Sequence, residues 1–166
     1  MKENPKYSSI FGSIIVKPII SAEKDKYLSV ASIKQLKKFL PDVDIEKNHD
    51  LLPISFNACV INRVNKNSDV LTTKTALAFY KTFINKQINL NHDRTKVCGC
   101  ILNAGFSEFG TDKQLTLDDV KDEKGPFNIT LGGIIWRVVN EDLARMIEDS
   151  ADPDSENYLT ISASWE

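Results

Sequence analysis

Two histidines and several serines are the side chains of this sequence that could carry out nucleophilic catalysis. Such catalysis needs a hydroxyl or thiol and a base that can reach it, and His49 and His92 are the only histidines. His49 lies in the charged stretch KNHDLL, which favours a solvated loop side chain. His92 ends the stretch INLNH and begins HDRTK, so the pattern places it where a strand meets a turn. Histidines at strand ends are common, and His92 alone therefore does not establish chemistry.

The hydroxyl candidates are Ser162 and Ser164, which lie two residues apart in the stretch YLTISASW. In a strand, residues at i and i+2 lie on the same face, so the spacing does not choose between the two serines. A polar strand edge explains both of them without any catalytic role.

The cysteines raise the question of a metal site. Cys59, Cys98 and Cys100 are an odd number in a chain without a secretory start, which favours reduced thiols inside a cell over a disulfide framework. A zinc site at the Cys98-x-Cys100 pair would need two more ligands, and both histidines are distant in sequence. We therefore interpret the cysteines as small buried apolar residues and expect no metal and no cofactor.

The elements that must position these residues follow from the hydrophobic pattern. Three amphipathic helices are expected at Ser29–Leu40, from Thr72 or Thr73 to Asn85, and after an Asn140 cap at 141–149. The stretch 54–64 alternates, with Ile54, Phe56, Ala58, Val60 and Asn62 expected on one face. The charged excursion 108–124 is expected to be a surface loop with one turn of structure near residues 115–120. Further strands are expected at 10–20, 88–90, 97–104, 127–139 and 158–165.

This order of elements predicts an α+β fold with a largely antiparallel sheet or barrel. The 166 residues fit a single domain over 1–166, and 42% hydrophobic with 27% charged residues is ordinary globular composition. A net charge of -2 gives no electrostatic attraction to nucleic acid or to an anionic membrane. The longest apolar runs, such as Phe11–Val16, are too short for a membrane span, and no export signal is visible.

An ordered set of motifs resembles the prohead (head-maturation) proteases of tailed bacteriophages, which are serine proteases related to herpesvirus assemblin. The set is SFNACVINRVNKNSD, a helix, FINKQINLNHDRTKVCGCI and the final YLTISASWE, and it covers roughly residues 54–166. Its most specific pieces are the Asn91-His92 pair before a strand with Gly99, and the terminal Ser-x-Glu.

The resemblance implies a herpesvirus-protease-like fold, a mostly antiparallel β-barrel surrounded by helices. On that basis His92 matches the catalytic base, Ser164 matches the nucleophile, and Ser162 is the alternative nucleophile. The resemblance further implies that phage scaffold and major capsid proteins are the substrates, inside the prohead in the host cytoplasm. It leaves self-association open.

Three points remain open within this interpretation. Asp69 is the candidate for orienting His92, although a turn aspartate that bonds its own backbone explains it as well. The chain ends at Glu166, two residues after Ser164, which suggests either a protein cut short or self-processing after Glu166. The alternative function is a noncatalytic capsid or scaffold component that retains the protease-like fold.

Overall fold

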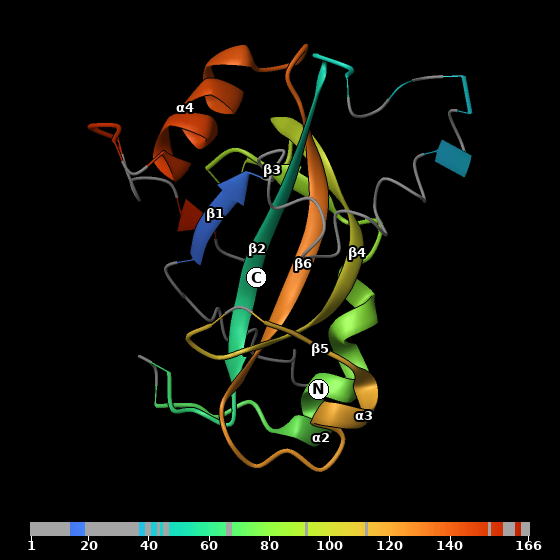
Figure 1. Cartoon of the computed structure of the whole chain (residues 1–166), viewed down its shortest axis with the longest axis vertical. Coiled ribbons are helices and arrows are strands. Elements are labelled where there is room, and N and C mark those ends of the chain that lie inside the picture. Colours follow the sequence, from blue (N-terminus) through green and yellow to red (C-terminus); the bar gives the residue numbers. More distant parts are fainter. Residues whose placement is uncertain are drawn as a thin grey trace, which may run out of the picture.

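The protein is described by a computed structural model in which residues 14–18, 37–38, 41–42, 44, 47–65, 68–91, 93–111, 113–152, 154–157 and 162–163 are described (Figure 1). For residues 14–18, 151 and 162–163 this description covers the backbone only. The strands are β1 (Ile14–Pro18), β2 (Leu51–Ile61), β3 (Gln87–Asn89), β4 (Val97–Glu108), β5 (Gln114–Leu115), β6 (Phe127–Trp136) and β7 (Ser162–Ala163). The helices are α2 (Thr73–Phe79), the 3₁₀ helix η2 (Tyr80–Phe83), α3 (Leu117–Val120) and α4 (Glu141–Ala151).

The strands form one antiparallel sheet in the order β3-β4-β6-β2-β1-β7, and β5 pairs with β4. The α+β class and the antiparallel sheet are thus confirmed. The expected closed barrel is not shown, because no described strand joins β3 to β7 and these two strands form the edges of an open sheet. The structure therefore does not confirm a herpesvirus-protease-like fold.

Two bulges interrupt the long central strands. Pairing of β2 with β6 shifts between Asn57 and Cys59, and pairing of β4 with β6 shifts between Ile101 and Asn103. A bulge inserts one extra residue and so changes which face the following side chains occupy. The predicted face of β2 is therefore right for Ile54 and wrong beyond the bulge, where Ile61 is fully buried in place of Val60.

One face of the sheet carries the hydrophobic core, which has two parts. At the end of the sheet where β2 and β4 finish and β6 begins, the buried residues Ile61, Phe106 and Phe127 pack with α2, η2 and α3. At the other end, α4 contributes Ala144 and Ile147 to a second cluster with residues of β2, β4 and β6. Figure 1 shows α4 near one end of the sheet and α2 with α3 near the other.

The predicted helix caps are confirmed by their hydrogen bonds. The Thr72 hydroxyl accepts from the N–H of Thr75 at 3.3 Å, so Thr72 rather than Thr73 begins α2. The Asn140 side chain accepts from the N–H of Leu143 at 2.9 Å at the start of α4. In the 108–124 excursion, the predicted turn of structure is α3, preceded by the two-residue strand β5.

The expected helix Ser29–Leu40 lies outside the described residues except for residues 37–38, which are helical. Among the described helices, none is both long enough and apolar enough to cross a membrane.

Candidate active site

The segment between β3 and β4, which contains His92 in sequence, forms a turn whose other residues are described. The N–H of Leu90 donates to the carbonyl of Lys96 at 3.0 Å, and the N–H of Asp93 donates to the carbonyl of Leu90 at 3.0 Å. Asn91 has a φ of 52°, a left-handed conformation that asparagine tolerates better than most residues. His92 itself lies outside the described residues, so its position stays a prediction; β3 ends at Asn89 and β4 begins at Val97.

The carboxylate of Asp93, next to His92 in sequence, is already used by this turn. Asp93 Oδ1 accepts from the hydroxyl of Thr95 at 2.6 Å and from the N–H of Thr95 at 2.9 Å. These two bonds, led by the hydroxyl, hold the pKa of Asp93 below its usual value. Lys96 Nζ lies 3.4 Å from the other carboxylate oxygen. The carboxylate of Asp93 therefore closes the turn.

Ser162 lies in β7, directly opposite Ile15 of β1. The strand predicted at residues 158–165 is thus present at Ser162–Ala163, while the side chain of Ser162 and the whole of Ser164 lie outside the described residues. In strand order, β7 and β3 are the two edges, and four strands lie between them. Flat pairing at about 4.8 Å per strand would separate these edges by more than 20 Å.

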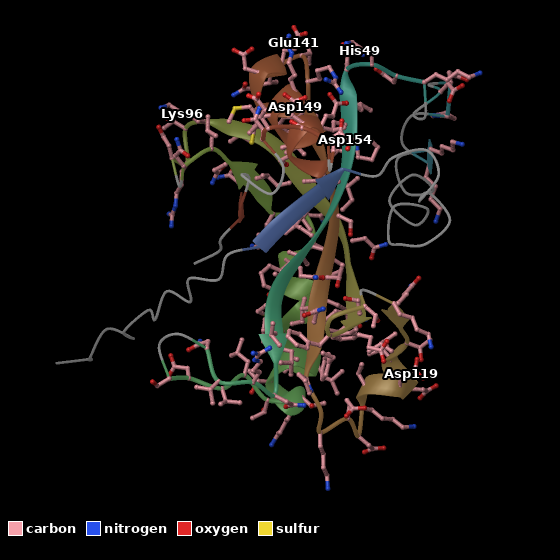
Figure 2. All side chains as sticks on the ribbon, turned by 60° about the vertical axis from the view of Figure 1, so that its left-hand side comes forward. His49, Lys96, Asp119, Glu141, Asp149 and Asp154 are labelled. Carbon is pink, nitrogen blue, oxygen red and sulfur yellow. The ribbon has the colours of Figure 1, made fainter. Side chains whose placement is uncertain are left out.

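The register of the strands places β3 and β1 at the same end of the sheet, although on opposite sides of it. Ile88 of β3 packs against the cluster to which α4 contributes Ala144 and Ile147, and α4 also lies against β1. Figures 1 and 2 agree that β3 and β1 lie at the α4 end of the sheet. The strand that precedes His92 in sequence and the strand that pairs with β7 therefore lie at the same end of the sheet.

Two glycines permit a close approach of β4 and β6 at this end of the sheet. A Cβ atom added to Gly99 of β4 would lie 2.1 Å from the carbonyl oxygen of Ile134, and one added to Gly133 of β6 would lie 2.5 Å from that of Cys100. Both distances are shorter than van der Waals contact, so only glycine allows the backbones of these two paired strands to approach this closely. Gly99, which the resemblance includes, is therefore needed for packing in its own right.

Asp69, the candidate for orienting His92, lies at the opposite end of the sheet. It follows β2, whose Ile61 pairs with Phe127 at the start of β6, whereas the β3–β4 turn precedes Gly99, which pairs with Ile135 near the end of β6. The 10 residues of β6 span roughly 30 Å. Asp69 is exposed, its N–H donates to Asn65 Oδ1 at 3.0 Å, and its carbonyl accepts from the N–H of Asn65 at 2.9 Å. The structure thus places Asp69 in a loop turn at the end of the sheet opposite the β3–β4 turn.

The prediction that His49 is an exposed loop residue is confirmed. It is exposed near the start of β2, and its backbone carbonyl accepts from Arg137 Nε at 2.9 Å (Figure 2). Arg137 also binds Glu148 of α4 through both terminal nitrogens, at 2.9 and 2.5 Å. The pair joins the end of β6 to α4 and to the chain before β2, so it positions the helix that leads into β7.

A buried polar network lies on the face of the sheet opposite the hydrophobic core, and it was not predicted from the sequence. Thr130 Oγ1 donates to Asn57 Oδ1 at 2.7 Å and is also 2.7 Å from Ser107 Oγ, which accepts from Asn128 Nδ2 at 3.2 Å. The three residues on β4 and β6 are at most 3% exposed. The four side chains are neutral and include no base, so they can hold the register of three strands but do not activate Ser107. The alternation of Asn128 and Thr130 in FNITL was the available signal.

The described cysteines are free thiols. Cys98 is buried and donates to the carbonyl of Ile88 at 3.3 Å, and burial raises the pKa of Cys59 to about 12. A thiol that stays protonated is a poor nucleophile and a poor metal ligand at neutral pH. Among the described residues, no group of three or more histidine, cysteine or acidic side chains could hold a metal ion.

Comparison with known proteins adds no relative: no family model, no curated protein and no solved structure matches the chain.

Proposed function

We propose that this protein is a serine endopeptidase that cleaves scaffold and major capsid proteins during phage head maturation, inside the prohead in the host cytoplasm. His92 is the general base and Ser164 the nucleophile, with Ser162 as the alternative nucleophile. The proposal rests on the ordered resemblance of residues 54–166 to prohead proteases. The structural observation that supports it most is the register of the sheet, which places β3 and β1, with β7 paired to β1, at the same end.

In this mechanism the serine Oγ attacks the carbonyl carbon of the scissile peptide while the His92 imidazole takes the hydroxyl proton. The imidazolium then gives that proton to the leaving amine, which departs and leaves an acyl-enzyme ester. A water molecule attacks the ester with His92 again as base, and the serine is regenerated with release of the new carboxylate. Asp69 has no part in this scheme, because it lies at the far end of the sheet.

The direct test is cleavage of the scaffold and capsid proteins encoded with this chain. We expect His92→Ala and one of Ser164→Ala and Ser162→Ala to lower the rate on the order of a thousandfold or more. His49→Ala is the matched control for histidine removal, because its side chain is exposed and outside the proposed site, and it should cleave at the parental rate. Parental rates in all three site variants would overturn the proposal.

A fluorophosphonate probe distinguishes the alternative function. An active serine becomes labelled in the parent and not in the variant that lacks the nucleophile. A folded parent that neither labels nor cleaves would favour a noncatalytic capsid or scaffold component with the same fold.

A further inference from the structure

One face of α4 is exposed and combines apolar with acidic side chains. Asp142, Met146 and Asp149 follow one another at i, i+4 and i+7, a spacing that places them on one side of the helix. Met146 is 51% exposed, and the turn before the helix adds Val138 and Val139, which are 75% and 58% exposed. We call this surface the α4 face. Its apolar centre is accompanied by two carboxylates about two helical turns apart.

The carboxylates of the α4 face are not neutralised locally. The two arginine side chains of this region are held by Glu141 and Glu148, whereas Asp142 and Asp149 form no ion pair with any described residue. Residues 141–157 contain seven acidic side chains and one basic side chain. Figure 2 shows Glu141 and Asp149 at the α4 end of the sheet. The α4 face therefore carries a net negative charge.

A face of opposite charge and equal spacing lies on α2 and η2. Lys74, Ala78 and Lys81 are exposed and again stand at i, i+4 and i+7, and η2 continues α2 without a break. Neither lysine forms an ion pair within the described part of the chain, although Lys81 Nζ lies 5.7 Å from the centroid of the Tyr80 ring. Residues 70–92 contain three lysines and no acidic residue. This surface, the α2 face, is therefore positive and has a small residue at its centre.

The acids of α3, which packs into the same core cluster as α2, are engaged within their own segment. Asp118 Oδ1 lies 3.2 Å from Lys121 Nζ, and Asp119 Oδ2 accepts from the Thr116 hydroxyl at 2.6 Å. These acids therefore leave the lysines of the α2 face available to a partner.

We propose that the α4 face of one copy of this protein docks on the α2 face of a second copy, with each carboxylate opposite a lysine and Met146 over Ala78. The charged groups stand about 10 Å apart on both helices, so the two ion pairs form together. A long side chain over a small one lets two helices pack closely. The two faces lie at opposite ends of the sheet (Figure 1), so they cannot bind each other within one molecule. The resulting assembly is head-to-tail, and it does not depend on the proposed catalysis.

Charge favours this partner over the alternatives. Two α4 faces packed together would bring four carboxylates into one interface, which like-charge repulsion disfavours. A nucleic acid or an anionic membrane would be repelled by the α4 face for the same reason. The α2 face offers both the opposite charge and the matching spacing.

Sedimentation velocity on the full chain measures the association. We expect the weight-average mass to rise with protein concentration at about 0.05 M salt and to return to that of the monomer at about 0.5 M, because salt screens exposed charges. A parent that stays monomeric at low salt would overturn the inference and would leave the α4 face to a foreign basic partner.

Charge reversal on one face at a time tests the pairing. The variant Asp142→Lys/Asp149→Lys reverses the α4 face. The variant Lys74→Glu/Lys81→Glu reverses the α2 face, and each variant alone should be monomeric. An equimolar mixture of the two should associate again, because each reversed face then meets an oppositely charged face on the other variant. A mixture that stays monomeric, with both variants folded by circular dichroism, would overturn the inference. An α2-face variant that associates like the parent would also overturn it, since that result is expected for a contact between two α4 faces.

Two further variants complete the experiment. Lys113→Glu/Lys124→Glu makes the same charge change at exposed positions outside both faces and should associate like the parent. Asp142→Asn/Asp149→Asn covers the case in which the reversed α4 variant does not fold, and it should weaken the association about tenfold or more. Unchanged association in this asparagine variant would overturn the inference.

Discussion

Asn62 and Thr73 bind each other twice, and the pair joins the end of β2 to the start of α2. Asn62 Nδ2 donates to Thr73 Oγ1 at 2.8 Å, and the N–H of Thr73 donates to Asn62 Oδ1 at 3.1 Å. Asn62 Nδ2 also lies 3.1 and 3.0 Å from the carbonyl oxygens of Glu123 and Gly125. The φ of Asn62 is 56°, a conformation in which asparagine costs less than most residues. One side chain therefore holds together three segments of the end opposite α4.

Replacement of Asn62 should destabilise the whole fold. We expect Asn62→Ala to lower the free energy of unfolding by about 2–4 kcal/mol, because several hydrogen bonds are lost and alanine is strained at positive φ. Asn62→Gly should cost about 1 kcal/mol less, since glycine has no such strain. Urea denaturation of both variants measures the difference. Equal stability of the alanine variant and the parent would show that this clamp is dispensable.

Gly99 should tolerate no side chain. We expect Gly99→Ala to lower the free energy of unfolding by about 3 kcal/mol or more, because its Cβ would lie 2.1 Å from a backbone oxygen that cannot move alone. Gly110 is the matched control: it has a φ of +89° and nothing within 4 Å of an added Cβ. Gly110→Ala should therefore cost only about 1 kcal/mol, from backbone strain. Thermal or urea unfolding measures the stability of both variants. A larger loss of stability in Gly110→Ala than in Gly99→Ala would contradict the close approach of the paired strands β4 and β6.

The Arg137–Glu148 pair should contribute more than the other ion pair of α4. The Arg137 side chain is 11% exposed, whereas Glu141 and Arg145 are 64% and 62% exposed. We expect Glu148→Gln to lower the free energy of unfolding by about 1–2 kcal/mol, a value reduced by the partial exposure of Glu148. Glu141→Gln should change it by less than about 0.5 kcal/mol. Urea unfolding measures both, and equal losses would show that the bidentate contact does not hold α4.

Alkaline pH should destabilise the protein through Cys59. Burial raises the pKa of its thiol to about 12, whereas the thiol of the unfolded chain titrates near about 8.5. Between these values the unfolded state releases a proton that the folded state retains, so stability falls as pH rises. We expect Cys59→Ala to show a shallower decline from pH 8.5 upward in urea unfolding.

Thiol labelling provides an independent reading of the same site. At pH 8, Cys59 should react with a disulfide reagent only after unfolding, because little thiolate forms in the folded state. Rapid labelling of Cys59 in the native protein would contradict the raised pKa of its thiol.

Several helices and strands could be predicted from the sequence because the residues that indicate them lie within or beside them. The Thr72 and Asn140 caps lie next to the helices that they begin, and the β-branched alternation near Ile54 predicts a strand without reference to other segments. The positions of Val60 and Asn62 could not be predicted in this way. They depend on a bulge whose extra residue is defined only by pairing with β6.

The sequence by itself determined the α+β class and the antiparallel strands, and it carries the resemblance that motivates a protease. Only the tertiary structure decided that Asp69 lies a strand length away from the β3–β4 turn and that Asp93 is used to close it. The physical reason is that separation in space depends on which strands pair and in which register. Residues 23 positions apart in the chain, such as Asp69 and His92, carry no local signal of that pairing.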